Sequence, residues 1–212
     1  MRTDELAAML ARGGGLPQDA PTRRHAFAVA SGALTSALLM ALTLGVRADI
    51  AQAALLPLFW SKLVLLGAFA AVCLVVVMRL SRPGATLATL PALLGLPVIA
   101  VWLGAGVTLA EAEPAVRSAM VFAPTWQSCA LRIAALSVPP LIAALWALKG
   151  LAPTRLAFAG GAAGLLAGAL GALAYAMHCP ETALPFLALW YPLGMLIPAA
   201  GGALLGAALL RW

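Results

Sequence analysis

Charged residues are scarce in this sequence of 212 residues. Only 9% are Asp, Glu, Lys or Arg, whereas 64% are hydrophobic and the mean hydropathy is +1.02. This composition excludes a water-soluble globular protein and predicts that a lipid bilayer surrounds most of the chain. The formal net charge is +6. Because no basic run interleaved with aromatic residues accompanies it, we predict no direct nucleic acid binding and interpret the excess as cytoplasmic loop charge.

Residues that build catalytic sites are equally few. The chain has two His and three Cys, and it contains no CxxC, Walker A, GxSxG or HExxH motif. No acidic residue lies in the middle of a hydrophobic run, where a transporter would bind a coupling ion or a proton. We therefore predict that the protein is not an enzyme. A small-solute or ion transporter and a membrane thiol redox protein stand as the alternative functions.

Six hydrophobic runs, each close to the ~20 residues that cross a bilayer, follow one another with short interruptions. They cover residues 26–46, 58–78, 87–110, 128–148, 156–177 and 185–210. The predicted fold is all-α, a polytopic membrane protein of six transmembrane helices. These helices would form a domain of residues 25–212, with residues 1–24 as a separate N-terminal segment. The adjacent Pro139 and Pro140 predict a kink in the fourth span.

Basic residues gather on one side of the predicted bundle. An even number of spans puts both termini on the same side, and this side holds nine of the 13 basic residues. The positive-inside rule therefore predicts that both termini are cytoplasmic. Lys62 and Arg132 lie inside spans near their outer ends, where they either snorkel or pair with acidic loops. The nine are Arg2, Arg12, Arg23, Arg24, Arg79, Arg82, Lys149, Arg155 and Arg211, and the opposite loops hold Arg47, Arg117, Asp49, Glu111, Glu113 and Glu181.

The N-terminal segment contains one short amphipathic pattern. Two acidic residues suit the positive end of a helix dipole, and three apolar residues at helical spacing form one stripe. Three glycines at 13–15 end the pattern, and residues 16–22 predict a linker. A helix this short is marginal in water, so the segment is either a frayed tail or a helix that docks its stripe in a groove on a soluble partner. Its residues are Asp4, Glu5, Leu6, Met9 and Leu10.

Two cysteines are predicted at the same depth on the outer face. Cys129 begins the fourth span and Cys179 ends the fifth, so they lie at the two far ends of one helical hairpin. Neighbouring helix axes are ~8–10 Å apart and a disulfide needs Cα atoms within ~4.4–6.8 Å, so the hairpin permits contact without requiring it. A disulfide, a dithiol switch and part of a metal site all suit such a pair. Cys73, deep in the second span, is interpreted as a small packing residue.

An imidazole and a carboxylate accompany these thiols. His178 adjoins Cys179, and Glu181 follows two residues later. Arg132 lies one helical turn from Cys129, where a cation favours thiolate over thiol. Two thiolates with an imidazole suit a thiophilic ion such as zinc or cadmium, and thiolates are also the groups that oxidants attack. These residues therefore suit a metal-binding or redox-reactive site with Arg132 as its modulator, and a static disulfide between the two helices stands as the alternative. We predict no cofactor beyond a transient thiophilic metal ion.

Five segments of the chain together resemble a known family. The most specific is the His-Cys-Pro-Glu turn at 178–181, paired with one cysteine about fifty residues upstream. The combination is similar to the NrsF-type membrane anti-sigma factors of proteobacteria, and the resemblance runs along the whole chain. The segments are TWQSC at 125–129, LSVPP at 136–140, GLAPT at 150–154, YAMHCPE at 175–181 and LWY at 189–191.

The resemblance implies a function that the residues alone do not specify. It implies a multi-pass protein of the bacterial inner membrane that holds an extracytoplasmic-function (ECF) sigma factor inactive. The sigma factor would be released when Cys129 and Cys179 register heavy metals or oxidative stress, and residues 4–10 would contact it. The expected partners are thus an ECF-type RNA polymerase sigma factor and membrane lipid.

Overall fold

The structure, a computed structural model, describes residues 5, 20–81, 90–151 and 153–211 of the chain. Six helical stretches in this part of the chain are long and apolar enough to cross a membrane. The all-α, six-span prediction is therefore confirmed. The helices are α2 (Ala20–Thr43), α3 (Ile50–Ala53), α4 (Pro57–Leu80), α5 (Leu90–Glu111), α6 (Pro114–Val121), α7 (Trp126–Leu136), α8 (Val138–Lys149), α9 (Leu156–Ala176) and α10 (Leu184–Leu209).

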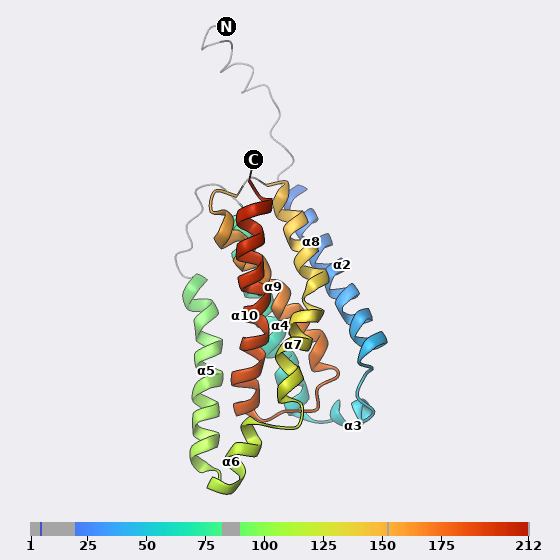
Figure 1. Ribbon diagram of the computed structural model, residues 1–212, viewed down its shortest axis with the longest axis vertical. Helices are drawn as coiled ribbons and strands as arrows, with labels where there is room; N and C mark the ends of the chain where they lie inside the picture. Colours follow the sequence, from blue (N-terminus) through green and yellow to red (C-terminus); the bar gives the residue numbers. More distant parts are fainter. Residues whose placement is uncertain (1–4, 6–19, 82–89, 152, 212) are drawn as a thin grey trace.

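Helix α9 lies at the centre of the bundle and packs against α2, α4, α7, α8 and α10. Most of its residues are buried, because its side chains are mostly small and are apolar on every side of the helix. Helix α5 lies at the edge of the bundle, and its larger contacts are with α4 and α10. The beginning of α2 and the end of α10 lie at the same end of the bundle (Figure 1).

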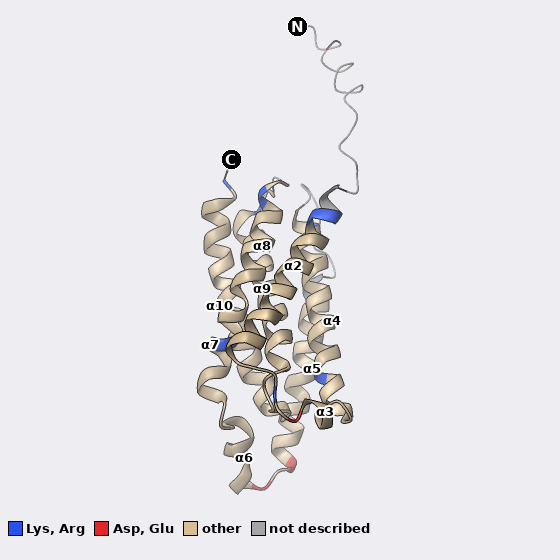
Figure 2. Ribbon diagram, turned by 90° about the vertical axis from the view of Figure 1, so that its right-hand side faces the viewer, with Lys and Arg blue, Asp and Glu red and all other residues tan. Residues whose placement is uncertain are grey.

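Most of the basic residues lie at one end of the bundle and the acidic residues at the other (Figure 2). One end, here called the basic end, carries the beginning of α2 and the ends of α4, α8 and α10. The other, the acidic end, carries the short helices α3 and α6. This separation agrees with the charge asymmetry behind the predicted orientation, which stays a prediction. By their positions on these elements, the basic end holds Arg23, Arg24, Arg79, Lys149, Arg155 and Arg211, and the acidic end holds Asp49, Glu111, Glu113 and Glu181 together with Arg47 and Arg117.

Helix boundaries differ from the predicted ones at three places. The fourth span, predicted as one kinked run over 128–148, is two helices that meet at Ser137. The first helix begins at Ala20, so it includes the last residues of the predicted linker. The short helices α3 and α6, in the connections after α2 and α5, were not predicted, because neither is long enough to form a clear hydrophobic period.

Prolines explain the break between α7 and α8, and α2 compensates for it. Pro140 has no N–H to donate to the carbonyl of Leu136. Instead the buried Ser36 hydroxyl of α2 donates to Leu136 O at 2.9 Å, and the Ser137 hydroxyl donates to Ile133 O at 2.6 Å. Since an unpaired carbonyl is costly away from water, these bonds hold the break in place and join α2 to it.

Close contact between α9 and α10 depends on glycine. The Cα of Gly206 faces Gly160, where an added Cβ on Gly206 would lie 2.7 Å from the Gly160 Cα. An added Cβ on Gly164 would lie 2.7 Å from the Ala199 Cα, and one on Gly168 would lie 2.8 Å from the Met195 Cα. These neighbours are backbone atoms, which do not move aside as a flexible side chain does. These glycines therefore form the principal helix contact.

We expect Gly164→Ala to destabilise the protein by about 3 kcal/mol or more, at the upper end of the cost of overpacking. The matched control is Gly201→Ala in α10, where an added Cβ meets no atom within 4 Å. Unfolding of both variants in mild detergent, followed by loss of helical signal, measures the difference. Equal stability of the two variants would show that the α9–α10 contact is looser than described.

Candidate functional site

The predicted cysteine pair lies at the acidic end, on two different elements. Cys129 is in the first turn of α7 and Cys179 follows the end of α9, and they are 0% and 1% exposed. Both belong to one buried cluster that also contains Ile133 and Phe186. All three cysteines are described and are free thiols. Cys73 lies in the other core cluster, as a packing residue would.

Local sequence determines where the second thiol lies. Helix α9 ends as the amides of His178 and Cys179 both donate to Tyr175 O at 2.9 Å. Pro180 cannot continue the helix, and Pro185 favours the first turn of α10. The residues between form a short turn, here called the cysteine turn (177–183), which presents Cys179 to α7.

His178 connects the cysteine turn to two other elements. Its Nδ1 lies 2.9 Å from the carbonyl oxygen of Gly45, and its Nε2 lies 3.1 Å from Nη1 of Arg132. A carbonyl only accepts, so Nδ1 carries the proton. Arg132 only donates, so Nε2 is the acceptor. The contacts therefore define a neutral imidazole, which joins the loop after α2 to the cysteine turn and to α7.

The imidazole is thus engaged at both nitrogens and does not present a free lone pair to a metal ion. Among the described residues, no group of three His, Cys, Asp or Glu side chains is arranged to hold a metal. Glu181 contributes its backbone carbonyl to the site. The arrangement presents two sulfur atoms as the available soft ligands, with His178 as a neighbour that holds the turn.

Lys62 of α4 is a site residue that the sequence analysis did not assign. It is 5% exposed, and its Nζ donates to the carbonyl of Cys179 at 3.3 Å and to that of Glu181 at 2.9 Å. The ammonium also lies 5.0 Å from the ring centroid of Tyr191. Lys62 therefore neither snorkels nor forms a salt bridge with an acidic loop. The signal was a lone lysine within an apolar span, which favours a functional interpretation.

Two buried tyrosines complete the site. The hydroxyl groups of Tyr175 and Tyr191 are buried and have no hydrogen-bond partner of good geometry. Tyr175 lies beside Cys129, and Tyr191 lies beside Cys179. A thiolate accepts hydrogen bonds better than a thiol. Each phenol therefore offers a donor that gains a partner when its neighbouring sulfur loses a proton.

The loop after α2 supports His178 from the outside. Gly45 has φ of +74°, a left-handed conformation that a side chain would strain. Two residues on, the Arg47 guanidinium donates two hydrogen bonds of 2.6 Å to Asp49. This pair lowers the pKa of the exposed Asp49 carboxyl, so its contribution is present at neutral pH and is lost as the pH falls through that lowered value. The backbone amide of Arg47 donates to Met177 O at 3.4 Å.

Four of the predicted sigma-contacting residues, Asp4, Leu6, Met9 and Leu10, lie outside the described residues. Glu5, which is described, is helical and exposed. The sequence interpretation of this segment therefore stays a prediction.

Comparison with known proteins gives one consistent result. A family model described as "Negative regulator of sigma F" matches residues 10–212. The chain is 52% identical to "Probable anti-sigma-F factor NrsF" of Azospira oryzae over 214 residues, covering the whole of both chains. It is 40% identical to "Anti-sigma-F factor NrsF" of Caulobacter vibrioides over 215 residues, again covering both chains completely. No solved structure matches the chain.

Proposed function

Because this chain belongs to the NrsF family and is accordingly a negative regulator of a sigma factor, we propose that it binds an ECF-type sigma factor at the bacterial inner membrane and releases it when Cys129 and Cys179 react. The observation that carries the sensing proposal is the pair of buried free thiols on two different elements. Family membership favours this regulator over the transporter and the thiol redox protein.

A divalent metal ion can bind to Cys129 and Cys179 without a third ligand from the protein. A divalent soft ion such as cadmium displaces one proton from each thiol and forms two metal–sulfur bonds. The product carries no net charge, so burying it costs far less than burying an isolated ion. Lys62 and Arg132 both interact electrostatically with Cys129. Burial disfavours an isolated thiolate, and these two cations offset part of that cost while the bonds form.

A metal ion bound to both sulfur atoms would change the position of the cysteine turn relative to α7. Hydrogen bonds hold this turn to α4 through Lys62, to the loop after α2 through His178, and to α7 through Arg132. A packed cluster of this kind has discrete arrangements and does not deform continuously. We therefore assign the two states of the regulator to two positions of the cysteine turn against α7.

A continuous set of contacts leads from the thiols to the basic end. The break at Ser137 joins α7 to α8 and is bonded to α2 by Ser36. At the far end of α8, Arg24 of α2 donates to Trp146 O at 2.6 Å and lies 4.3 Å from the centroid of its ring. Arg24 is the last residue of the predicted N-terminal segment. A movement of α7 and α8 against α2 would therefore reach the residues that we expect to hold the sigma factor.

Release of the sigma factor requires a minimum free energy from the sensing event. A change from about 99% bound to about 99% free needs roughly 5.5 kcal/mol of differential stabilisation. Metal–thiolate bonds supply apparent free energies of about 10–16 kcal/mol in structural zinc sites. A soft ion at two sulfurs is therefore strong enough to drive the shift, whereas an exposed salt bridge, worth about 0–1 kcal/mol, is not.

A release assay on the purified complex tests the proposal. We expect the detergent-solubilised protein, immobilised with its sigma factor, to release most of that factor when cadmium is added, and to retain it when the same concentration of magnesium is added. Magnesium prefers oxygen ligands, so it controls for ionic strength and charge. Equal elution by the two ions would contradict a thiol sensor, and failure to capture any sigma factor would contradict the binding function itself.

A further inference from the structure

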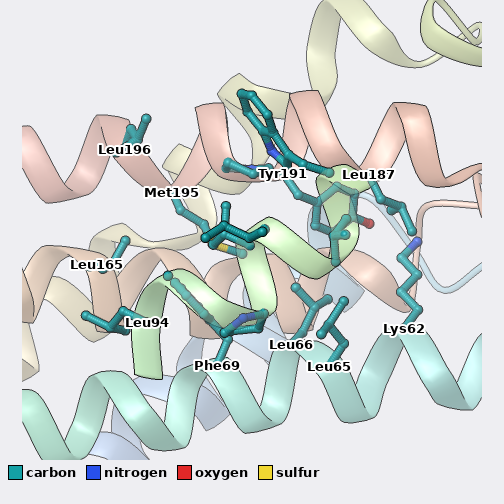
Figure 3. A pocket seen from close by; sticks show the side chains of 17 residues that line it. Lys62, Leu65, Leu66, Phe69, Leu94, Leu165, Leu187, Tyr191, Met195 and Leu196 are labelled. Atoms are coloured by element: carbon teal, nitrogen blue, oxygen red, sulfur yellow. The ribbon is translucent and has the colours of Figure 1, made fainter. Parts of the chain in front are cut away.

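An apolar cavity lies between α4, α5 and α10, beside the cysteine site but separate from the thiols. Its volume is about 460 Å³, within the ~300–1,000 Å³ range of small-molecule sites. Figure 3 shows Lys62 and Leu187 at one end, and Leu94, Leu165 and Leu196 at the other. Lys62 is the one charged residue among the described residues of the lining.

A second cavity of about 400 Å³ continues the first toward the basic end. The two share Leu94, Leu165 and Leu196, and the second extends to Cys73 and to Leu80, the last residue of α4. Together they make a long apolar track along most of α4. A track of this shape suits an extended hydrocarbon chain better than a compact molecule. Since the larger contacts of α5 within the described residues are with α4 and α10, and α5 exposes much of its surface, the bilayer has access to the track from the side.

Lys62 determines which charge a ligand of this cavity would carry. Its ammonium has three donors, of which two bind the carbonyls of Cys179 and Glu181. Within the described part of the chain, the only salt bridge joins Arg47 to Asp49, and Glu181 interacts with Lys62 only at longer range. A buried cation without a close anion costs several kcal/mol. An anion at this end of the cavity would offset that cost.

We propose that this cavity binds a long-chain fatty acid, with its carboxylate on Lys62 and its hydrocarbon chain along α4 and α10 toward Cys73. The carboxylate is the matching anion for the ammonium. It lies at the very end of a single chain, so it is small enough to reach the ammonium of a lysine residue that is 5% exposed. The glycerophosphate head of a two-chain lipid is too large for this position. This binding function goes beyond regulation of a sigma factor; it uses Lys62 of the cysteine site but neither of the two sulfur atoms.

The test measures binding of radiolabelled palmitate to the full chain in nanodiscs of phosphatidylcholine, at a pH at which its carboxyl is ionised. We expect saturable binding of about one palmitate per chain. Hexadecanol, which has the same chain length and no charge, should bind about tenfold more weakly or worse, since about 1.4 kcal/mol of lost ion pairing is a factor of ten. Lys62→Met should remove this preference for palmitate.

Two glycine variants separate ligand binding from folding. Gly95 lines the cavity and Gly106 does not, and both lie on α5, where an added Cβ meets no atom within 4 Å. Gly95→Leu should fill the cavity and weaken palmitate binding about tenfold or more, whereas Gly106→Leu should bind as the unsubstituted protein does. Equal binding by the two variants would overturn the proposal. Equal binding of hexadecanol and palmitate would overturn it too, as would displacement of palmitate by equimolar phosphatidylglycerol, because the occupant would then be a two-chain phospholipid.

Discussion

Replacing both Cys129 and Cys179 by serine should abolish cadmium-triggered release and leave sigma-factor binding intact. Serine keeps the approximate shape of cysteine but presents a hard oxygen that soft ions bind poorly. Without metal–sulfur bonds, nothing supplies the roughly 5.5 kcal/mol of differential stabilisation that is needed to shift the protein from the bound to the released state. A reporter gene controlled by the sigma factor should therefore stay at its uninduced level across a cadmium series, whereas the unsubstituted protein should allow full induction.

Three further variants make this result interpretable. Cys73→Ser should respond normally, because Cys73 lies in a different cluster of the core. Each single substitution, Cys129→Ser and Cys179→Ser, should be about as defective as the double variant, since one sulfur cannot bridge α7 to the cysteine turn. Full induction in the double variant would disprove the sensor. High reporter activity without metal would instead mean that the substituted protein fails to hold its partner, which capture from membranes would reveal.

Removing residues 1–22 should abolish capture of the sigma factor, a loss of about a hundredfold or more in affinity, or roughly 2.7 kcal/mol. The predicted stripe of Leu6, Met9 and Leu10 is an amphipathic surface outside the bundle, on the side with the cytoplasmic charge pattern. The measurement is affinity capture from gently solubilised membranes, with the co-purifying proteins identified and counted. A near-stoichiometric sigma factor should be present with the full chain and absent with the truncated one.

Point variants show whether the stripe itself is responsible. Met9→Asp places a charge in the stripe and should prevent capture, whereas Ala8→Asp places the same charge on the opposite side of the predicted helix and should not. Both keep the length of the segment and the beginning of α2. If Met9→Asp and the truncated protein both captured the sigma factor normally, the stripe would not be the docking surface. The connecting loops of the bundle would then be the candidate.

Much of the fold followed from the sequence because the relevant physics is local. A bilayer fixes the length of an apolar run, and backbone groups in lipid must be satisfied within the helix. The six spans, and the placement of Cys129 and Cys179 at the same end of the bundle, required nothing more. Pro139 and Pro140 marked the break in the fourth span for the same reason, since a missing N–H is a property of the residue itself.

Only the tertiary structure decided which faces meet. The spans are apolar on nearly every side, so hydrophobic periodicity does not mark the buried face of any helix, and packing in lipid depends on the fit of small residues. The bond from Ser36 to Leu136, the burial of Lys62 under the cysteine turn and the engagement of both nitrogens of His178 all join residues far apart in the chain. The sequence by itself determined the span lengths, the charge asymmetry and the depth of the thiols. The contacts that bring the two cysteines into one site depend on how six spans, apolar on nearly every side, pack together.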